Sequence, residues 1–162
     1  MVNLEKLNRN LLLIIADVIK NEVAETVKIQ ESQTIADTIY NEFEPAIYQR
    51  RGTSGGLADT SNMKVSHPVL RGNTVSVNVR NVTKGNNAKV VNNLQYIVET
   101  NMPTAEGNYY DFQKESDTSK YYLKPRPFQA HTVMRLKKNK AHLYAMKRGL
   151  MTKHGIKKVT IL

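Results

Sequence analysis

The four histidines are the residues best suited to bind a metal or to transfer a proton near neutral pH, and they are scattered along the chain. They are His67, His131, His142 and His154. Only His131 and His142 fall in one expected helix, where a separation of eleven residues places them about 16 Å apart. One metal ion cannot bridge that distance, and the chain has no cysteine to supply a thiolate. We therefore expect solvated or interface histidines and no metal site.

Paired carboxylates, the other common basis of acid–base chemistry, are also poorly placed. Glu42 and Glu44 lie two residues apart at the end of an expected helix, where side chains at that spacing do not face each other. Asp111, Glu115 and Asp117 fall in a polar loop expected over residues 101–120. No serine sits in a nucleophile elbow, and no thiol is present. We expect no catalytic residues and no cofactor, and hence no enzyme.

One glycine-rich run superficially resembles a phosphate-binding loop. Gly52-Thr53-Ser54-Gly55-Gly56 has the small residues that such a loop needs. A Walker-type loop also needs a lysine and a hydroxyl residue after its last glycine, whereas Leu57-Ala58-Asp59 follows here. The run is more typical of a mobile connection, and the sequence predicts a flexible loop over residues 45–62.

Charge is distributed very unevenly along the chain, whose net charge is +10. Residues 1–60 carry six basic and nine acidic side chains, whereas residues 61–162 carry eighteen basic and five acidic ones. Such asymmetry indicates either an anionic partner or an assembly in which acidic and basic surfaces of neighbouring copies meet. The candidate contacts, to DNA in a channel or to an acidic protein surface, are Arg50, Arg51, Lys137, Lys138, Lys140, Lys147 and Arg148.

The first element expected from the apolar pattern is an amphipathic helix. Leu4, Leu7, Leu11, Ile14 and Val18 follow one another at alternating spacings of three and four. Further apolar residues beside this stripe indicate that more than one side of the helix is covered. The pattern fits an ordinary core helix or a helix shared between the core and a subunit interface.

A second helix and a small sheet are expected to follow. Ile35, Ile39 and Phe43 lie four residues apart and precede a proline. Residues 73–83 alternate between valine and polar residues as a half-buried strand does, with residues 65–70 as a possible hairpin partner. Residues 94–100 are apolar enough for a strand or a short buried helix.

The C-terminal third is strongly basic and is expected to be mostly helical. Pro125 and Pro127 favour an extended approach to the helix, and Phe128 would plug its start. The basic helix is predicted over residues 127–150, with glycines as stops and a possible last strand at residues 159–162. Together the elements predict a single α+β domain, with a small, mostly antiparallel sheet packed by an N-terminal and a C-terminal helix. Its parts are residues 1–44 (helical), 45–62 (loop), 63–126 (sheet with long loops), 127–150 (basic helix) and 151–162 (tail).

Two short motifs, taken in order, give the chain a family resemblance. Tyr96 is followed by Glu99, and later Arg126-Pro127-Phe128 opens the basic helix. Over roughly residues 50–150 this resembles the tail-completion, or neck, proteins that join head and tail in long-tailed bacteriophages. Residues 55–62 stand where many members carry a Pro…Asp-Thr-Gly segment. The exact neck position, whether tail terminator, head-closure adaptor or tube-proximal ring, therefore stays open.

The resemblance implies a virion structural protein that is present in the host cytoplasm during assembly. It implies a homo-oligomeric ring that couples connector and tail proteins and carries out no catalysis. The basic surface could alternatively line a channel through which DNA passes without sequence-specific contacts. The alternative is a small basic nucleic-acid-binding domain acting through its C-terminal helix. No membrane is expected, because the longest apolar run, residues 11–16, is far shorter than the ~20 residues of a spanning helix. No secretory signal is expected in residues 1–6 either.

Overall fold

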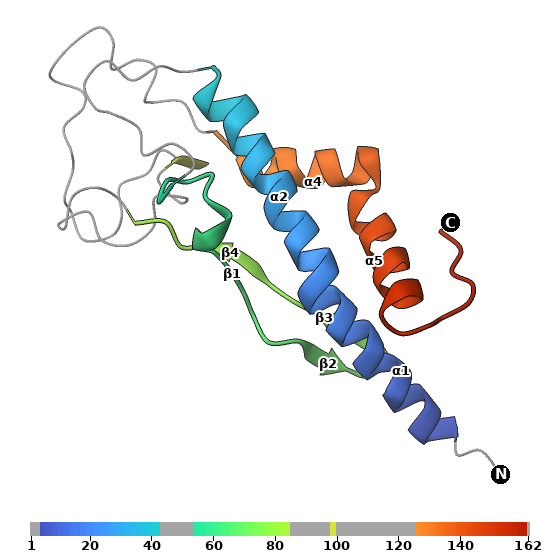
Figure 1. The fold of residues 1–162 in the computed structure, drawn as a ribbon. Helices are drawn as coiled ribbons and strands as arrows, with labels where there is room; N and C mark the ends of the chain where they lie inside the picture. Colours follow the sequence, from blue (N-terminus) through green and yellow to red (C-terminus); the bar gives the residue numbers. More distant parts are fainter. Residues whose placement is uncertain (1–3, 43–53, 85–97, 100–125, 162) are drawn as a thin grey trace, which may run out of the picture. The chain divides into compact units, whose positions relative to one another are not determined.

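The fold is α+β, as the sequence predicts, with helices towards both ends of the chain and, among the described residues, two small antiparallel sheets (Figure 1). The structure is a computed structural model, and it describes residues 4–42, 54–84, 98–99 and 126–161. Each of the two sheets has two strands, so a pair of ribbons takes the place of the single sheet expected.

Helical structure runs without interruption from Leu4 to Tyr40. Its segments are α1 (Leu4–Val18), η1 (Ile19–Val23), α2 (Ala24–Ile35) and η2 (Ala36–Tyr40), of which η1 and η2 are wider π-helical turns. Because no glycine or proline occurs between Leu4 and Tyr40, nothing in the sequence ends the helix between the two predicted segments. Phe43, expected on the second helix, lies outside the described residues.

Contacts divide the chain into two compact units, each built from segments that are far apart in the sequence. Unit 1 comprises Met1–Ile29, Val65–Arg80 and Leu136–Leu162, and unit 2 comprises Gln30–Lys64 and Asn81–Arg135. Each unit has buried apolar residues of its own. Those of unit 1 are Ala16, Val18, Ala24, Ala145 and Leu150. Those of unit 2 are Ile35, Ile39, Leu57, Ala58, Met63 and Phe128.

The predicted hairpin is present, in unit 1, although its second strand is shorter than expected. Strand β2 (Val69–Arg71) pairs antiparallel with β3 (Thr74–Ser76), so that Leu70 faces Val75 across the ladder. The turn between them uses Gly72, whose φ of 56° lies in the left-handed region that glycine tolerates best.

The prediction of one long strand over residues 73–83 is wrong. Strand β3 ends at Ser76, and a separate strand β4 (Val79–Asn81) follows. β4 pairs with β1 (Met63–Val65). In the gap, the Asn78 N–H donates to the Ser66 hydroxyl oxygen at 2.9 Å, while the Ser66 N–H donates to the Asn78 carbonyl. The serine side chain thus replaces a main-chain partner, and the regular ladder is interrupted at this point.

The segment 54–62 of unit 2 forms a turn and a short 3-10 helix, η3 (Thr60–Asn62), where a flexible loop is predicted. The Asp59 carboxylate accepts hydrogen bonds from the N–H groups of Gly55 at 2.6 Å and Ser61 at 2.9 Å. Leu57 and Ala58 are buried within the unit. A carboxylate that satisfies two main-chain donors stabilises the turn in the way that an N-cap does.

The prediction of a single basic helix over residues 127–150 is wrong as well, because the helix is interrupted at Lys140. Helix α4 (Phe128–Asn139) is followed by α5 (Ala141–Thr152), and Lys140 between them has left-handed dihedrals, φ 53° and ψ 22°. The Asn139 side-chain oxygen accepts from the Ala141 N–H at 3.0 Å, so one free donor at the start of α5 is satisfied locally.

Three further features of the C-terminal third differ from expectation. Gly149 lies inside α5, where it is buried, and does not end the helix; α5 continues to Thr152. The described residues 159–161 form no strand. Val133, placed on the apolar side of the predicted helix, is 49% exposed. The two helices α4 and α5 therefore do not share the single apolar stripe that the sequence suggests.

Candidate functional site

Four of the five residues that carry the family resemblance lie in the described part of unit 2, and they meet where α4 begins. The Arg126 N–H donates to the Val98 carbonyl at 2.9 Å, and the Gln129 N–H donates to the Glu99 carboxylate at 2.8 Å. Pro127 supplies the first carbonyl of the helix, which accepts from the His131 N–H. A carboxylate at a free helix N-terminus satisfies a donor and opposes the positive end of the helix dipole. Tyr96 lies outside the described residues.

Phe128, the first residue of α4, is completely buried. This confirms that it plugs the helix start. The Thr132 hydroxyl, one turn on, donates to the Phe128 carbonyl at 2.8 Å and is buried with it. Glu99, Arg126, Pro127 and Phe128 therefore form a helix-start anchor, which fixes where the helix starts.

A buried polar cluster in unit 2 was not anticipated from the sequence. The Asn81 side-chain amide donates to the Leu57 carbonyl at 2.8 Å and lies 3.4 Å from the Glu31 carboxylate. The Asn81 oxygen accepts from the Thr83 N–H at 3.1 Å, and the Thr83 hydroxyl is 2.6 Å from the same oxygen. Glu31, Asn81 and Thr83 are all buried. They join α2 and the end of β4 to the 54–62 turn.

Burial raises the pKa of Glu31 above its ordinary value, and the negative charge of Glu99 raises it further. The hydrogen bond from Asn81 acts in the opposite direction, but it is outweighed. A carboxyl group whose pKa is higher in the folded than in the unfolded state makes its full contribution to stability only at pH values below the unfolded pKa. That contribution is lost as the pH rises through the folded pKa.

We expect Glu31→Gln to remove this pH dependence. Glutamine keeps the oxygen that faces Asn81 but carries no charge, so the variant should gain stability over the wild type as the pH rises from acidic to neutral. Urea unfolding measured at several pH values would show it. Glu42→Gln, at an exposed position of the same unit, is the control. Parallel stability curves for wild type and Glu31→Gln would contradict this role.

In unit 1 an ion cluster ties the residues after α5 to α1. The Asp17 carboxylate lies 2.8 Å from both Lys153 Nζ and His154 Nε2, and Lys153 also approaches Glu22 at 3.6 Å. The hydrogen bond from Lys153 is the main reason that the pKa of Asp17 falls below its ordinary value. Because these side chains are substantially exposed, the pairs position the chain more than they stabilise it.

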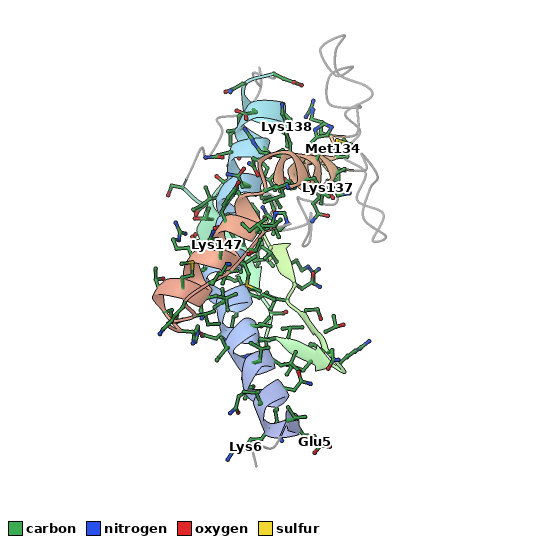
Figure 2. The ribbon with its side chains drawn as sticks, turned by 90° about the vertical axis from the view of Figure 1, so that its right-hand side faces the viewer. Glu5, Lys6, Met134, Lys137, Lys138 and Lys147 are labelled. Carbon is green, nitrogen blue, oxygen red and sulfur yellow. The ribbon has the colours of Figure 1, made fainter. Side chains whose placement is uncertain are left out.

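The basic residues singled out in the C-terminal third belong to unit 1 and are mostly exposed. Lys137 and Lys138 lie in the last turn of α4 and Lys147 lies on α5, as Figure 2 shows, while Lys140 occupies the break between the helices. None of them, nor Arg148, forms an ion pair with a carboxylate in the described part of the chain. Arg50 and Arg51 lie outside the described residues.

Charge is also distributed unevenly between the two units. Unit 1 contains fourteen basic and four acidic residues, and unit 2 contains ten of each. The whole net charge of +10 therefore belongs to unit 1. Three of its four acids, Asp17, Glu22 and Glu25, already pair with lysines of the same unit. Unit 1 presents an excess of positive charge to its surroundings.

The described residues show no grouping that resembles a metal site. No three histidine or carboxylate side chains among them come together as metal ligands would. His154 pairs with Asp17, and His67 and His131 are exposed. Within the same part of the chain, no helix combines the length and apolar character needed to cross a membrane.

Comparison with known proteins gives one kind of match, to a family model. No match was found among curated proteins or among solved structures. A family model, YomN, matches residues 3–152. The match spans α1 at one end and α5 at the other, so it includes the helix-start anchor, the buried polar cluster and the basic surface described above. By this match over nearly its whole length, the chain belongs to the YomN family.

Proposed function

We propose that the chain is a non-enzymatic structural protein of a bacteriophage head–tail junction, which forms or joins a ring coupling the connector to the tail. The observation that carries this proposal is the helix-start anchor. Glu99 and Arg126 are far apart in the sequence, yet their segments are held together at the point where Phe128 is buried. These are the residues through which the chain resembles neck proteins, and they act together in the fold.

Some acidic residues of the N-terminal part form ion pairs within the same chain. Asp17 and Glu22 pair with Lys153, and Asp37 pairs with Arg135 at 2.7 Å. Each of these pairs joins an acid from residues 1–60 to a base from residues 61–162 of the same chain. The charge asymmetry of the sequence is thus partly neutralised inside each copy. This weakens the idea of an acidic surface on one copy meeting a basic surface on the next.

Mass photometry and negative-stain imaging of the full chain, alone and mixed with candidate connector and tail proteins, test the proposal. We expect ring-shaped particles or a defined complex with at least one of these partners. A chain that remains monomeric at high concentration, both alone and with connector and tail partners, would overturn it.

A nucleic-acid-binding role is the second candidate, and the unpaired cations of unit 1 favour it. Lysines and arginines that contact phosphates release counterions, so affinity for duplex DNA should fall steeply with salt. Replacing Lys147 and Arg148 together with glutamate should weaken binding and reduce the slope of log K against log salt by about 2. Lys64→Glu in unit 2 is the control. Rings that form without measurable DNA affinity would favour the first proposal.

A further inference from the structure

The first three turns of α1 carry a leucine seam that the described residues of the chain leave open. Leu4, Leu7 and Leu11 are 76%, 56% and 45% exposed, although they lie on the same helix face as Val18, which is fully buried. The alternating spacings of three and four residues place all four at the a and d positions of a heptad. A sustained seam of this kind is typical of a helix that packs lengthwise against another helix.

The N-terminal part of the seam is exposed because α5 covers only its C-terminal end, at Val18. Helix α5 packs on α1 and η1, with Gly149 placed against Val18 and Glu22. Immediately after α5, Lys153 and His154 are held at Asp17. The hairpin meets α1 on another side, through the hydrogen bond between the side chains of Asn8 and Asn73 at 3.2 Å. None of these contacts covers Leu4 or Leu7.

The residues beside the seam show which occupant it suits. In the heptad, the flanking e and g positions are Asn8 and Asn10, which lie about 80° to either side of the seam. The charged residues of these turns, Glu5, Lys6 and Arg9, lie at least about 120° away from it. Figure 2 shows Glu5 and Lys6 at the N-terminal end of α1.

In coiled coils, charged residues at the e and g positions normally determine which helices can pair. Two helices whose e and g residues carry the same charge repel each other. Unit 1 carries the whole net charge of +10, so two copies repel each other over most of this unit. The seam is a strip without charge on it or directly beside it. An acidic partner would gain nothing from the asparagine flanks, whereas a second copy meets no like charge there.

We propose that the seam of α1 is a self-association surface, on which α1 of a second copy packs through Leu4, Leu7 and Leu11. The proposed function requires copies of the chain to associate, and this proposal identifies the surface through which they do so. The proposal rests on the proposed function only in that requirement. The seam is short, so pairing of two isolated copies is expected to be weak and to strengthen when other contacts bring copies together.

Sedimentation of the full chain over a concentration series tests the proposal. The wild type should form dimers or larger species as concentration rises, and the triple variant Leu4→Gln, Leu7→Gln, Leu11→Gln should associate more than about tenfold more weakly. Leu13→Gln is the matched control, because Leu13 is 53% exposed on the opposite face of α1. Circular dichroism should show the same helix content in all the variants.

Single cysteines locate the contact directly, because the chain has none of its own. Under mild oxidation Leu7→Cys should form disulfide-linked pairs readily, and Leu13→Cys should not. Leu4→Cys linking to itself would indicate parallel helices. Leu4→Cys linking preferentially to Leu11→Cys in a mixture would indicate antiparallel ones.

Several outcomes would overturn this inference, and each can be distinguished from an outcome that overturns the proposed function. If the wild type associates but the triple variant associates equally well, another surface holds the copies together and the head–tail proposal stands. If the triple variant loses thermal stability at concentrations where the wild type is monomeric, the seam is covered within its own chain. If Leu7→Cys gives no linked pairs in complexes with connector or tail proteins, the seam is not the contact between copies. A wild type that binds lipid vesicles through the seam and does not self-associate would also exclude it.

Discussion

Replacing Phe128 with alanine should lower the free energy of unfolding by about 3–5 kcal/mol, the largest effect expected from any single substitution in unit 2. The ring is completely buried at the first position of α4. Its removal deletes apolar contacts and leaves a cavity that the anchored helix start cannot easily close. Glu99 and Val98 hold that start by hydrogen bonds to main-chain N–H groups, so the backbone resists collapse into the space.

Urea denaturation followed by circular dichroism would measure this loss. Val133→Ala serves as the control, because Val133 lies on the same helix but is about half exposed, and its truncation should change stability by less than about 0.5 kcal/mol. Equal effects of the two substitutions would show that Phe128 does not hold the helix in the way the structure indicates. Phe128→Leu should recover most of the loss by refilling the cavity.

Gly149→Ala should destabilise the protein by about 1–3 kcal/mol, although the same change at an open helix position would stabilise it by about 1 kcal/mol. A β-carbon on Gly149 would lie 2.6 Å from Val18 Cγ1 and 3.3 Å from Glu22 Cγ. Val18 is fully buried, and a β-branched side chain has little rotamer freedom in a helix, so it cannot turn aside. The sign of the effect therefore reports the close packing of α5 on α1.

A double-mutant cycle with Val18→Ala tests the cause. Removing the valine methyl groups makes room for the new β-carbon, so Gly149→Ala should be far better tolerated in the Val18→Ala background. A coupling free energy of about 0.5–3 kcal/mol is expected between the two sites. Strictly additive effects, measured by the same urea titrations, would show that the two residues do not touch.

The features that could be predicted from the sequence depend on local patterns. The apolar spacing of α1, the glycine turn at Gly72 and the plug at Phe128 each follow from residues close together in the chain. Glu99 and Arg126 could be grouped in advance only through a family resemblance. No periodicity shows that a carboxylate will reach the first turn of a helix that begins much later in the chain.

The buried polar cluster could not be predicted, because its inward-facing residues beyond Val79 are polar. Val82, the next apolar residue, is one position out of phase with the alternation of Val75, Val77 and Val79. In the structure the inward row continues in phase with Asn81 and Thr83, which are buried, while Val82 is exposed. Apolar character normally marks the inward side of a strand, and here the satisfied hydrogen bonds of an amide and a hydroxyl replace it. Only knowledge of the Leu57 carbonyl and of Glu31, both far away in sequence, would have revealed this.

The break at Lys140 escaped prediction for a related reason. Nothing in its residue type marks it, since a lysine seldom adopts left-handed dihedrals. The side chain of Asn139, which accepts a hydrogen bond from the first N–H of the next helix, is the one local signal. Because α5 is a separate helix that begins after this break, its axis need not continue that of α4, and Gly149 can pack against Val18.

The construction of unit 1 from the first and last segments of the chain has a consequence for synthesis on the ribosome. The buried end of the α1 seam, at Val18, is covered by α5, whose last residue is Thr152. At the usual pace of translation, roughly 5–20 residues per second, α1 is made many seconds before its cover exists. During that interval Val18 and Gly149 cannot yet meet, and α1 leaves the ribosome with its whole apolar face open. Nascent or prematurely terminated chains should therefore be the species most in need of chaperones, and coexpressing the missing C-terminal segment should rescue them.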